Sequence, residues 1–141
     1  MSSETYKAME RRVVDALINH GNMAVADEVF APEYVYHGPG GQELRGPEGF
    51  KQLITLFRTA FPDIRLTIRD MVVEGDKLVS RFTAQGTHKG DLMGIPPTGK
   101  RISVTGIIIH RIAGGKVVES WENFDQLLMM QQLGVIPAPE Q

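Results

Sequence analysis

A single aspartate, Asp125, stands between the apolar end of an expected strand and the start of an expected helix in WENFDQLLMMQQLG, residues 121–134. Aspartate is favoured at such a point as a helix N-cap, because its carboxylate accepts hydrogen bonds from the free N–H groups of the first turn. A carboxylate at the end of a strand can also act as a general acid or base in a pocket. The residues alone leave both roles open, and the two roles are compatible.

The hairpin that precedes Asp125 predicts which side chains share its face of the sheet. Residues 101–124 read as two strands that turn at Gly114–Gly115, and a two-residue turn sets the pairing of the strands. In that register His110 lies opposite Glu119. One face then combines carboxylate, amide, indole and imidazole groups. The residues on this face are Ile108, His110, Glu119, Trp121, Asn123 and Asp125. This mixture is typical of a pocket, and a half-exposed sheet face would also show it.

Three further side chains are candidates for the same pocket. Arg81 shares a strand face with Thr83 and is either a solvent-facing charge or a clamp for an anion or a carbonyl group. His37 ends a short strand before a glycine-rich turn, where a histidine is either a surface residue or a catalytic partner. Met93 belongs to the connection 88–100, whose apolar residues either complete the core or form a pocket wall.

The composition excludes several other kinds of chemistry. The chain has no cysteine, which rules out disulfides and thiolate catalysis, and no spacing of His, Asp and Glu resembles a metal site. The net charge is −2, from 15 basic and 17 acidic residues without a basic stripe, so we expect no nucleic-acid or membrane partner. The first residues lack the apolar core of a secretory leader, and we expect a cytoplasmic protein. What remains is acid–base chemistry, without a cofactor, by one carboxylate and one or two histidines.

The pattern of the chain predicts a single domain, residues 1–141, with helices before most of the strands. We expect helices near 4–20, 23–31 and 47–61, a strand at 33–37, strand pairs that turn at 75–76 and 114–115, a final helix at 126–133 and a loose tail at 136–141. This order is typical of the α+β class, with N-terminal helices packed on one face of a curved, mainly antiparallel sheet. Such a sheet forms a cone whose mouth is a common place for a ligand site.

Several motifs follow one another in a specific order along nearly the whole chain. They are HGP…LRGPEGFKQL (37–53), GTHKGDLMGIPPTGK (86–100), R-I-x-x-G-K-V-V-E-x-W-x-x-x-D (111–125) and QQLG (131–134). Together they resemble the SnoaL-like polyketide cyclases, often called ester cyclases. The resemblance implies the cone-shaped, nuclear-transport-factor-like fold. It also implies that Asp125 acts as general acid and base in an intramolecular aldol closure that needs neither metal nor cofactor. The chain departs from many relatives, which carry an acidic residue at the position of Ile108 and an apolar residue at that of His110.

Two functions of different classes are compatible with these observations. The first is a cofactor-independent cyclase that acts on a small, apolar, carbonyl-bearing substrate. In this enzyme Asp125 is the base and acid, His37 and His110 are hydrogen-bond partners or proton relays, and the substrate-binding residues are Arg81, Trp121, Asn123 and Met93. The second is a non-catalytic module that holds a small hydrophobic molecule or dimerises. A buried Asp125 with a raised pKa that faces a cavity favours the enzyme, and an exposed Asp125 that caps the helix, with the cone filled by side chains, favours the module.

The opposite face of the second hairpin predicts how the chain assembles. It is expected to carry Ile107, Ile109, Val118 and Phe124, which is more apolar surface than a monomer comfortably exposes. We therefore expect a homodimer, or a higher homo-oligomer, packed through this face of the sheet.

Overall fold

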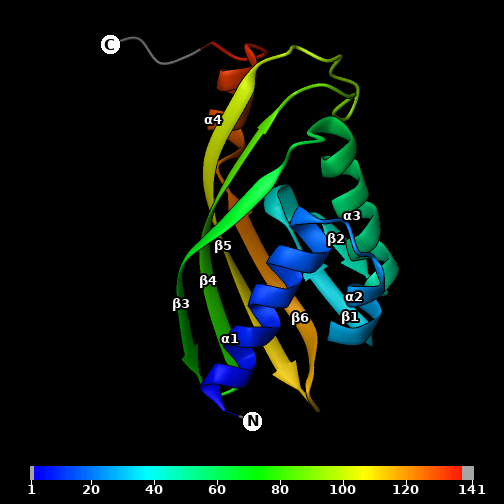
Figure 1. The fold of residues 1–141 in the computed structure, drawn as a ribbon, viewed down its shortest axis with the longest axis vertical. Helices are drawn as coiled ribbons and strands as arrows, with labels where there is room; N and C mark the ends of the chain where they lie inside the picture. The colour runs from blue at the N-terminus through cyan, green and yellow to red at the C-terminus, as the bar shows by residue number, and fades with distance from the viewer. Residues whose placement is uncertain (1, 138–141) are drawn as a thin grey trace.

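The computed structural model describes residues 2–137 as helices packed against one curved sheet, so the expected α+β class is confirmed (Figure 1). The helical segments are α1 (Ser3–Arg12), the π-helical continuation η1 (Val13–Asn19), α2 (Ala24–Val29), the short 3₁₀ turn η2 (Pro39–Gly41), α3 (Gly46–Ala60) and α4 (Gln126–Leu133). The strands are β1 (Phe30–His37), β2 (Glu43–Arg45), β3 (Arg65–Glu74), β4 (Lys77–Thr87), β5 (Arg101–Ala113) and β6 (Lys116–Phe124). Within this part of the chain no helix is long and apolar enough to cross a membrane.

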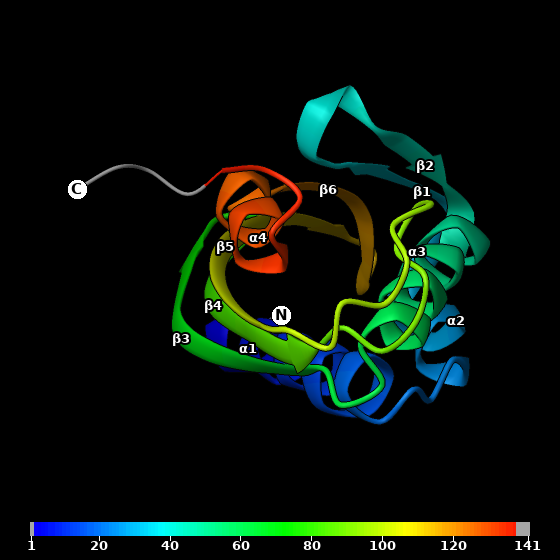
Figure 2. The ribbon, with the colours of Figure 1, turned by 90° about the horizontal axis from the view of Figure 1, so that it is seen from above.

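The sheet has the strand order β2-β1-β6-β5-β4-β3, and all its neighbours are antiparallel except β1 and β6, which run parallel. The two expected hairpins form the β3–β4 and β5–β6 pairs, and their turns fall at the expected glycines, Gly75 and Gly114. The parallel pairing of β1 was not expected, and neither was β2. Seen from above, the sheet bends from β3 round to β6, with α1 and α3 facing its concave side (Figure 2).

The first two helices differ from the expected ones at their ends. Ser2 caps α1 through its side chain, and the expected helix 4–20 changes to π-helical geometry at Val13. The expected second helix ends early, because β1 begins at Phe30 and includes Pro32. Proline is tolerated there since the β1–β6 register shifts between Phe30 and Val35, which leaves an irregular stretch of the ladder. Most of the tail expected at 136–141 lies outside the described residues.

The connection between β4 and β5 is folded back onto the end of α3. Backbone N–H groups of residues 89 and 90 both donate to the carbonyl oxygen of Ala60. A Cβ at Gly90 would lie 2.1 Å from the carbonyl oxygen of Thr59, so only glycine permits this close approach. Leu92 is completely buried in the core, whereas Met93 is 57% exposed. The core-completing role expected for this connection is therefore confirmed for Leu92.

Candidate active site

The pairing of β5 with β6 differs by one residue from the expected register. Ile108 lies opposite Glu122 and His110 opposite Ser120, because the register shifts between Arg111 and Ile112. The expected pairing of His110 with Glu119 is therefore wrong. A β-bulge adds one residue to one strand, and a shift of one residue moves a side chain to the other face of the sheet.

The shift divides the expected polar face between the two sides of the sheet. Ile108 and His110 face the concave side, where Glu122 and Phe124 join them as lining residues of a cavity. Trp121 pairs with Ile109 on the opposite, outer side. The expectation that Asp125, Asn123, Trp121, Glu119 and His110 share one face is wrong for His110, and the expectation that Phe124 lies on the dimer face is wrong as well.

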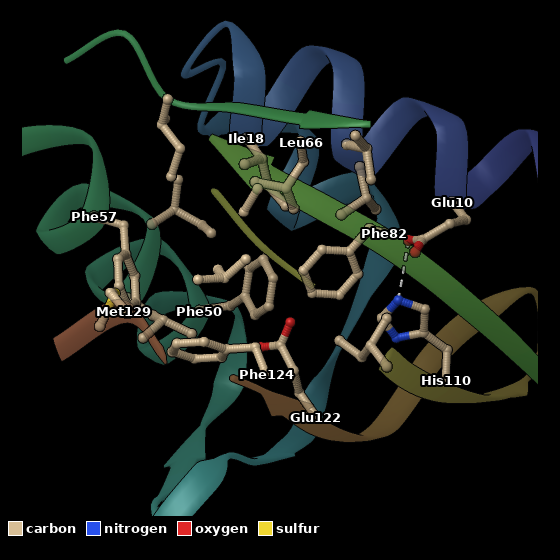
Figure 3. Close-up of a pocket in the computed structure, with 18 of the residues that line it drawn as sticks. Glu10, Ile18, Phe50, Phe57, Leu66, Phe82, His110, Glu122, Phe124 and Met129 are labelled. Atoms are coloured by element: carbon tan, nitrogen blue, oxygen red, sulfur yellow. Dashed lines mark hydrogen bonds and ion pairs between the residues drawn. The ribbon is translucent and has the colours of Figure 1, made fainter. Parts of the chain in front are cut away.

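The cavity lies between α1, α3 and the concave face of the sheet, and its wall is almost entirely apolar (Figure 3). Aromatic rings from α3 and the sheet form much of the wall, among them Phe50, Phe57, Phe82 and Phe124. The lining side chains that carry polar atoms, among the described residues, are Glu10, His110 and Glu122. This composition is typical of a small-molecule site, in which a few polar groups orient an apolar ligand.

Gly106 gives the aromatic rings their room on the concave face. A Cβ at this position would lie 2.5 Å from Cζ of Phe82 and 2.8 Å from Cβ of Phe124. The absence of a side chain on the middle of β5 therefore allows both rings to pack across the strand. This close approach shapes the cavity wall beside Glu122.

Glu122 points into the cavity from β6, with the rings of Phe82 and Phe124 close to its carboxyl group (Figure 3). It accepts a hydrogen bond from the hydroxyl of Tyr36, which comes from the neighbouring strand β1. Burial raises the pKa of Glu122 to about 7, although the bond from Tyr36 and the charge of His110 act in the opposite direction. A carboxyl group with this pKa can both accept and donate a proton near neutral pH.

His110 is 2% exposed and is held on both sides of its ring. Nε2 lies 3.1 Å from Oε1 of Glu10 on α1, and Nδ1 lies 2.6 Å from Oγ of Ser120 on β6. The pair of Glu10 and His110 is drawn as a dashed line in Figure 3. His110 is thus the predicted catalytic residue that the structure brings to the cavity.

Asp125 lies at the start of α4, and its carboxylate caps that helix. Oδ1 accepts a hydrogen bond of 3.0 Å from the backbone N–H of Leu128. The side chain is exposed and is not part of the cavity lining. The capping role expected for Asp125 is confirmed, while its catalytic role stays a prediction.

His37 and Trp121 lie together on the outer side of the sheet. Their rings stack, with centroids 5.6 Å apart and planes 15° apart, and Nε2 of His37 lies 2.7 Å from Oε2 of Glu119. Arg111 donates to the other carboxylate oxygen at 3.0 Å. The bond with His37 and the guanidinium of Arg111 lower the pKa of Glu119. These four side chains form a cluster on the surface, separated from the cavity by the sheet.

The remaining predicted residues also lie outside the cavity lining. Arg81 is exposed on β4 and donates from Nε to Asp70 on β3 at 2.6 Å, while Phe82 lines the cavity from the other face. Asn123 is exposed on the outer side of β6. Met93 lies in the exposed part of the connection described above. The structure therefore does not bring these substrate-binding candidates together, and their roles stay predictions.

Glu10, Tyr36 and Glu122 are the polar residues of the site that the sequence did not single out. Glu10 precedes Val13, Val14 and Leu17 at helical spacing, which places it on the apolar stripe and could have indicated that it is buried. No comparable pattern exists for Glu122, since its face depends on a bulge. Across residues 2–137 no group of three His, Asp or Glu side chains is arranged to hold a metal ion.

Comparison with known proteins gives a consistent picture. The family described as SnoaL-like polyketide cyclase matches residues 8–133. The aklanonic acid methyl ester cyclase DnrD of Streptomyces peucetius is 33% identical over 136 residues, covering 92% of each chain. The nogalonic acid methyl ester cyclase of Streptomyces nogalater is 30% identical over 82% of this chain and 88% of its own.

Solved structures show the same arrangement of helices and strands. TsrD from Streptomyces laurentii has a TM-score of 0.87 at 33% identity, covering 96% of this chain and 99% of its own. AclR from Streptomyces galilaeus, provisionally named a hydroxylase, has a TM-score of 0.87 at 28% identity, covering 99% and 87%. The expected cone-shaped, nuclear-transport-factor-like fold is thereby confirmed.

Proposed function

The chain belongs to the SnoaL-like polyketide cyclase family, and we propose that it closes a ring in a small, apolar polyketide ester by intramolecular aldol addition. The names of two relatives, cyclases of aklanonic and nogalonic acid methyl esters, support this class of substrate. The apolar cavity with three polar groups suits such a molecule. The single observation that carries the proposal is the carboxyl group of Glu122 inside this apolar cavity, where burial raises its pKa to about 7.

Glu122 is the proposed acid–base group of the reaction. In its ionised form it removes a proton from a substrate carbon that lies between two carbonyl groups, where the C–H bond is already acidic. The electron pair of that C–H bond forms the new C–C bond to a second carbonyl carbon. The π electrons of this second carbonyl group move to its oxygen. Glu122 then returns the proton to this oxygen, so the product has the same atoms as the substrate and no co-reactant is required. A positioned carboxyl group of this kind contributes rate factors of about 10² to 10⁴.

The resemblance noted in the sequence implies the same role for Asp125. The two assignments of the acid–base role lead to different predictions. Glu122 lies inside the cavity, whereas Asp125 is exposed and caps α4. This exposure is also the observation that favours the alternative function, a non-catalytic module that binds a small hydrophobic molecule. Substitution of each carboxyl by its amide separates the three possibilities, because both amides retain the size and most hydrogen bonds of the acid.

The experiment is a ring-closure assay with aklanonic acid methyl ester and nogalonic acid methyl ester as probes, followed by chromatography and mass spectrometry. We expect Glu122→Gln to lower kcat about 100-fold or more and Asp125→Asn to leave it within about twofold. A large loss of kcat in Asp125→Asn with little change in Glu122→Gln would assign the acid–base role to Asp125 instead. Binding of either ester without turnover by the wild-type protein would favour the binding module.

The homodimer expected from the sequence is supported by the outer side of the sheet. One cross-strand row of this side consists of Val72, Val79, Ile109, Trp121 and His37, each paired with the next. The adjoining position Ile107 is 47% exposed. Charged pairs of both signs flank the row, namely Arg81 with Asp70 and Arg111 with Glu119. An apolar row between charges of both signs can face a second copy of itself across a two-fold axis.

A further inference from the structure

Glu10 is a carboxylate buried on the apolar stripe of a helix. It is 3% exposed, and 100 positions along the chain separate it from His110, its partner. Burial of a charged pair costs several kcal/mol per ion in desolvation, so such a pair persists when geometry and hydrogen bonds compensate for that cost. The position of Glu10 beside a cavity that contains Glu122 points to a role in that cavity.

We propose that Glu10 is a positioning residue that keeps His110 protonated, so that an imidazolium faces Glu122 and the reacting part of the substrate. The geometry provides an acceptor for each ring proton. Nε2 lies 3.1 Å from a carboxylate oxygen of Glu10 and Nδ1 lies 2.6 Å from Oγ of Ser120, so in the protonated ring both N–H groups have an oxygen to which they can donate. A ring held at both nitrogens cannot rotate, so the position of its charge relative to the cavity is fixed.

The other titratable groups around His110 do not supply this function. Tyr34 and Tyr36 approach from β1, and burial raises the pKa of both hydroxyls, so both are neutral at physiological pH. Glu122 approaches from β6, but its hydrogen-bond partner is Tyr36. In the part of the chain that the structure describes, Glu10 is the carboxylate in direct contact with the imidazole ring.

The consequence for Glu122 follows from the two opposing charges near it. A positive charge on His110 lowers the pKa of Glu122, a negative charge on Glu10 raises it, and the effect of His110 is the larger one. Neutral residues at both positions would therefore leave Glu122 harder to ionise. The imidazolium also stabilises negative charge that develops on the substrate when its C–H proton is removed.

The test uses Glu10→Gln, which keeps the size of the side chain and removes its charge. Nitrogen NMR of the imidazole, assigned by comparison with His110→Gln, reports how many ring nitrogens carry a proton. At neutral pH we expect two protonated ring nitrogens in the wild-type protein and one in Glu10→Gln. Glu10→Asp, which retains the charge, should restore the second proton. Glu28→Gln is the matched control, because Glu28 forms an exposed pair with Arg12.

A neutral His110 in the wild-type protein would overturn the proposal without any variant, and so would an unchanged spectrum in Glu10→Gln. The effect on catalysis rests on the proposed function of Glu122. With the two methyl esters as probes, Glu10→Gln should lower kcat at least about tenfold, leave KM nearly unchanged, and move the ascending limb of the pH–rate profile to higher pH. If neither ester is turned over, the proposed function fails while the NMR result still decides the role of Glu10.

Discussion

Ile108 and Glu122 lie directly opposite each other on β5 and β6, and both side chains line the cavity. In these apolar surroundings the pKa of Glu122 is raised to about 7, from about 4.3 for an unperturbed glutamate. The folded state therefore binds this proton more tightly than the unfolded chain does. The stability that Glu122 contributes is fully present below about pH 4 and is lost as the pH rises through about 7.

We expect the free energy of unfolding of the wild-type protein to fall by roughly 3 kcal/mol relative to that of Glu122→Gln between pH 4 and pH 8. The glutamine cannot ionise and so lacks this dependence. Urea unfolding of both proteins at several pH values measures the difference. A constant difference across this range would mean that Glu122 does not titrate there.

Asp125 gives a separate prediction for stability through its cap on α4. Asp125→Ala removes the acceptor for the N–H of Leu128 and should lower the free energy of unfolding by about 1 kcal/mol. Asp125→Asn retains an acceptor oxygen and should lose much less. Both can be compared by urea unfolding at pH 7, and equal stability of all three proteins would contradict the capping role.

Two adjacent residues of the connection between β4 and β5 should respond differently to truncation. Leu92→Ala leaves a cavity in the core and should cost about 2–5 kcal/mol. Met93→Ala removes a side chain that is 57% exposed and should change the free energy of unfolding by at most about 0.5 kcal/mol. Affinity for the two methyl esters, measured on Met93→Ala, tests the substrate-binding role predicted for Met93. An unchanged affinity would remove that role.

The homodimer predicts a mass of twice 15.6 kDa in solution. Ile107→Lys places a charge beside the apolar row of the outer side and should shift the protein toward the monomer mass. The matched control is Leu127→Lys, because Leu127 is 59% exposed on α4 rather than on the sheet. Light scattering at micromolar concentration measures all three masses. A monomeric wild-type protein, or equal effects of the two lysines, would rule out this interface.

The elements of the fold were predictable where local patterns are strong. The hairpin turns at Gly75 and Gly114 and the helix 126–133 all depend on residues close together in the chain. The parallel pairing of β1 was not predictable in this way, since it joins segments far apart and has no turn sequence between them. The order of the motifs was the other strong indication of the fold, because the motifs extend along nearly the whole chain.

The candidate site was predicted less well than the fold, because its residues depend on a bulge and on tertiary contacts. His110 was identified, but Glu122 was not, because the bulge after Arg111 that brings it opposite Ile108 has no clear sequence pattern. One additional residue in a strand reverses every assignment of face beyond it. Glu10 was missed because a charged residue on an apolar helix stripe is usually at the edge of that stripe, and only the tertiary structure shows its partner.

The parallel pairing of β1 with β6 has a consequence for how the protein is made. Tyr36 and Glu122 are 86 positions apart, so their bond cannot form until the last strand has left the ribosome. A nascent chain that ends before β6 would expose the hydrogen-bonding edges of β1 and β5 and would lack the carboxyl group of Glu122. The cavity is thus completed only when synthesis is nearly finished, and premature termination would yield an open sheet prone to aggregation rather than a partly folded site.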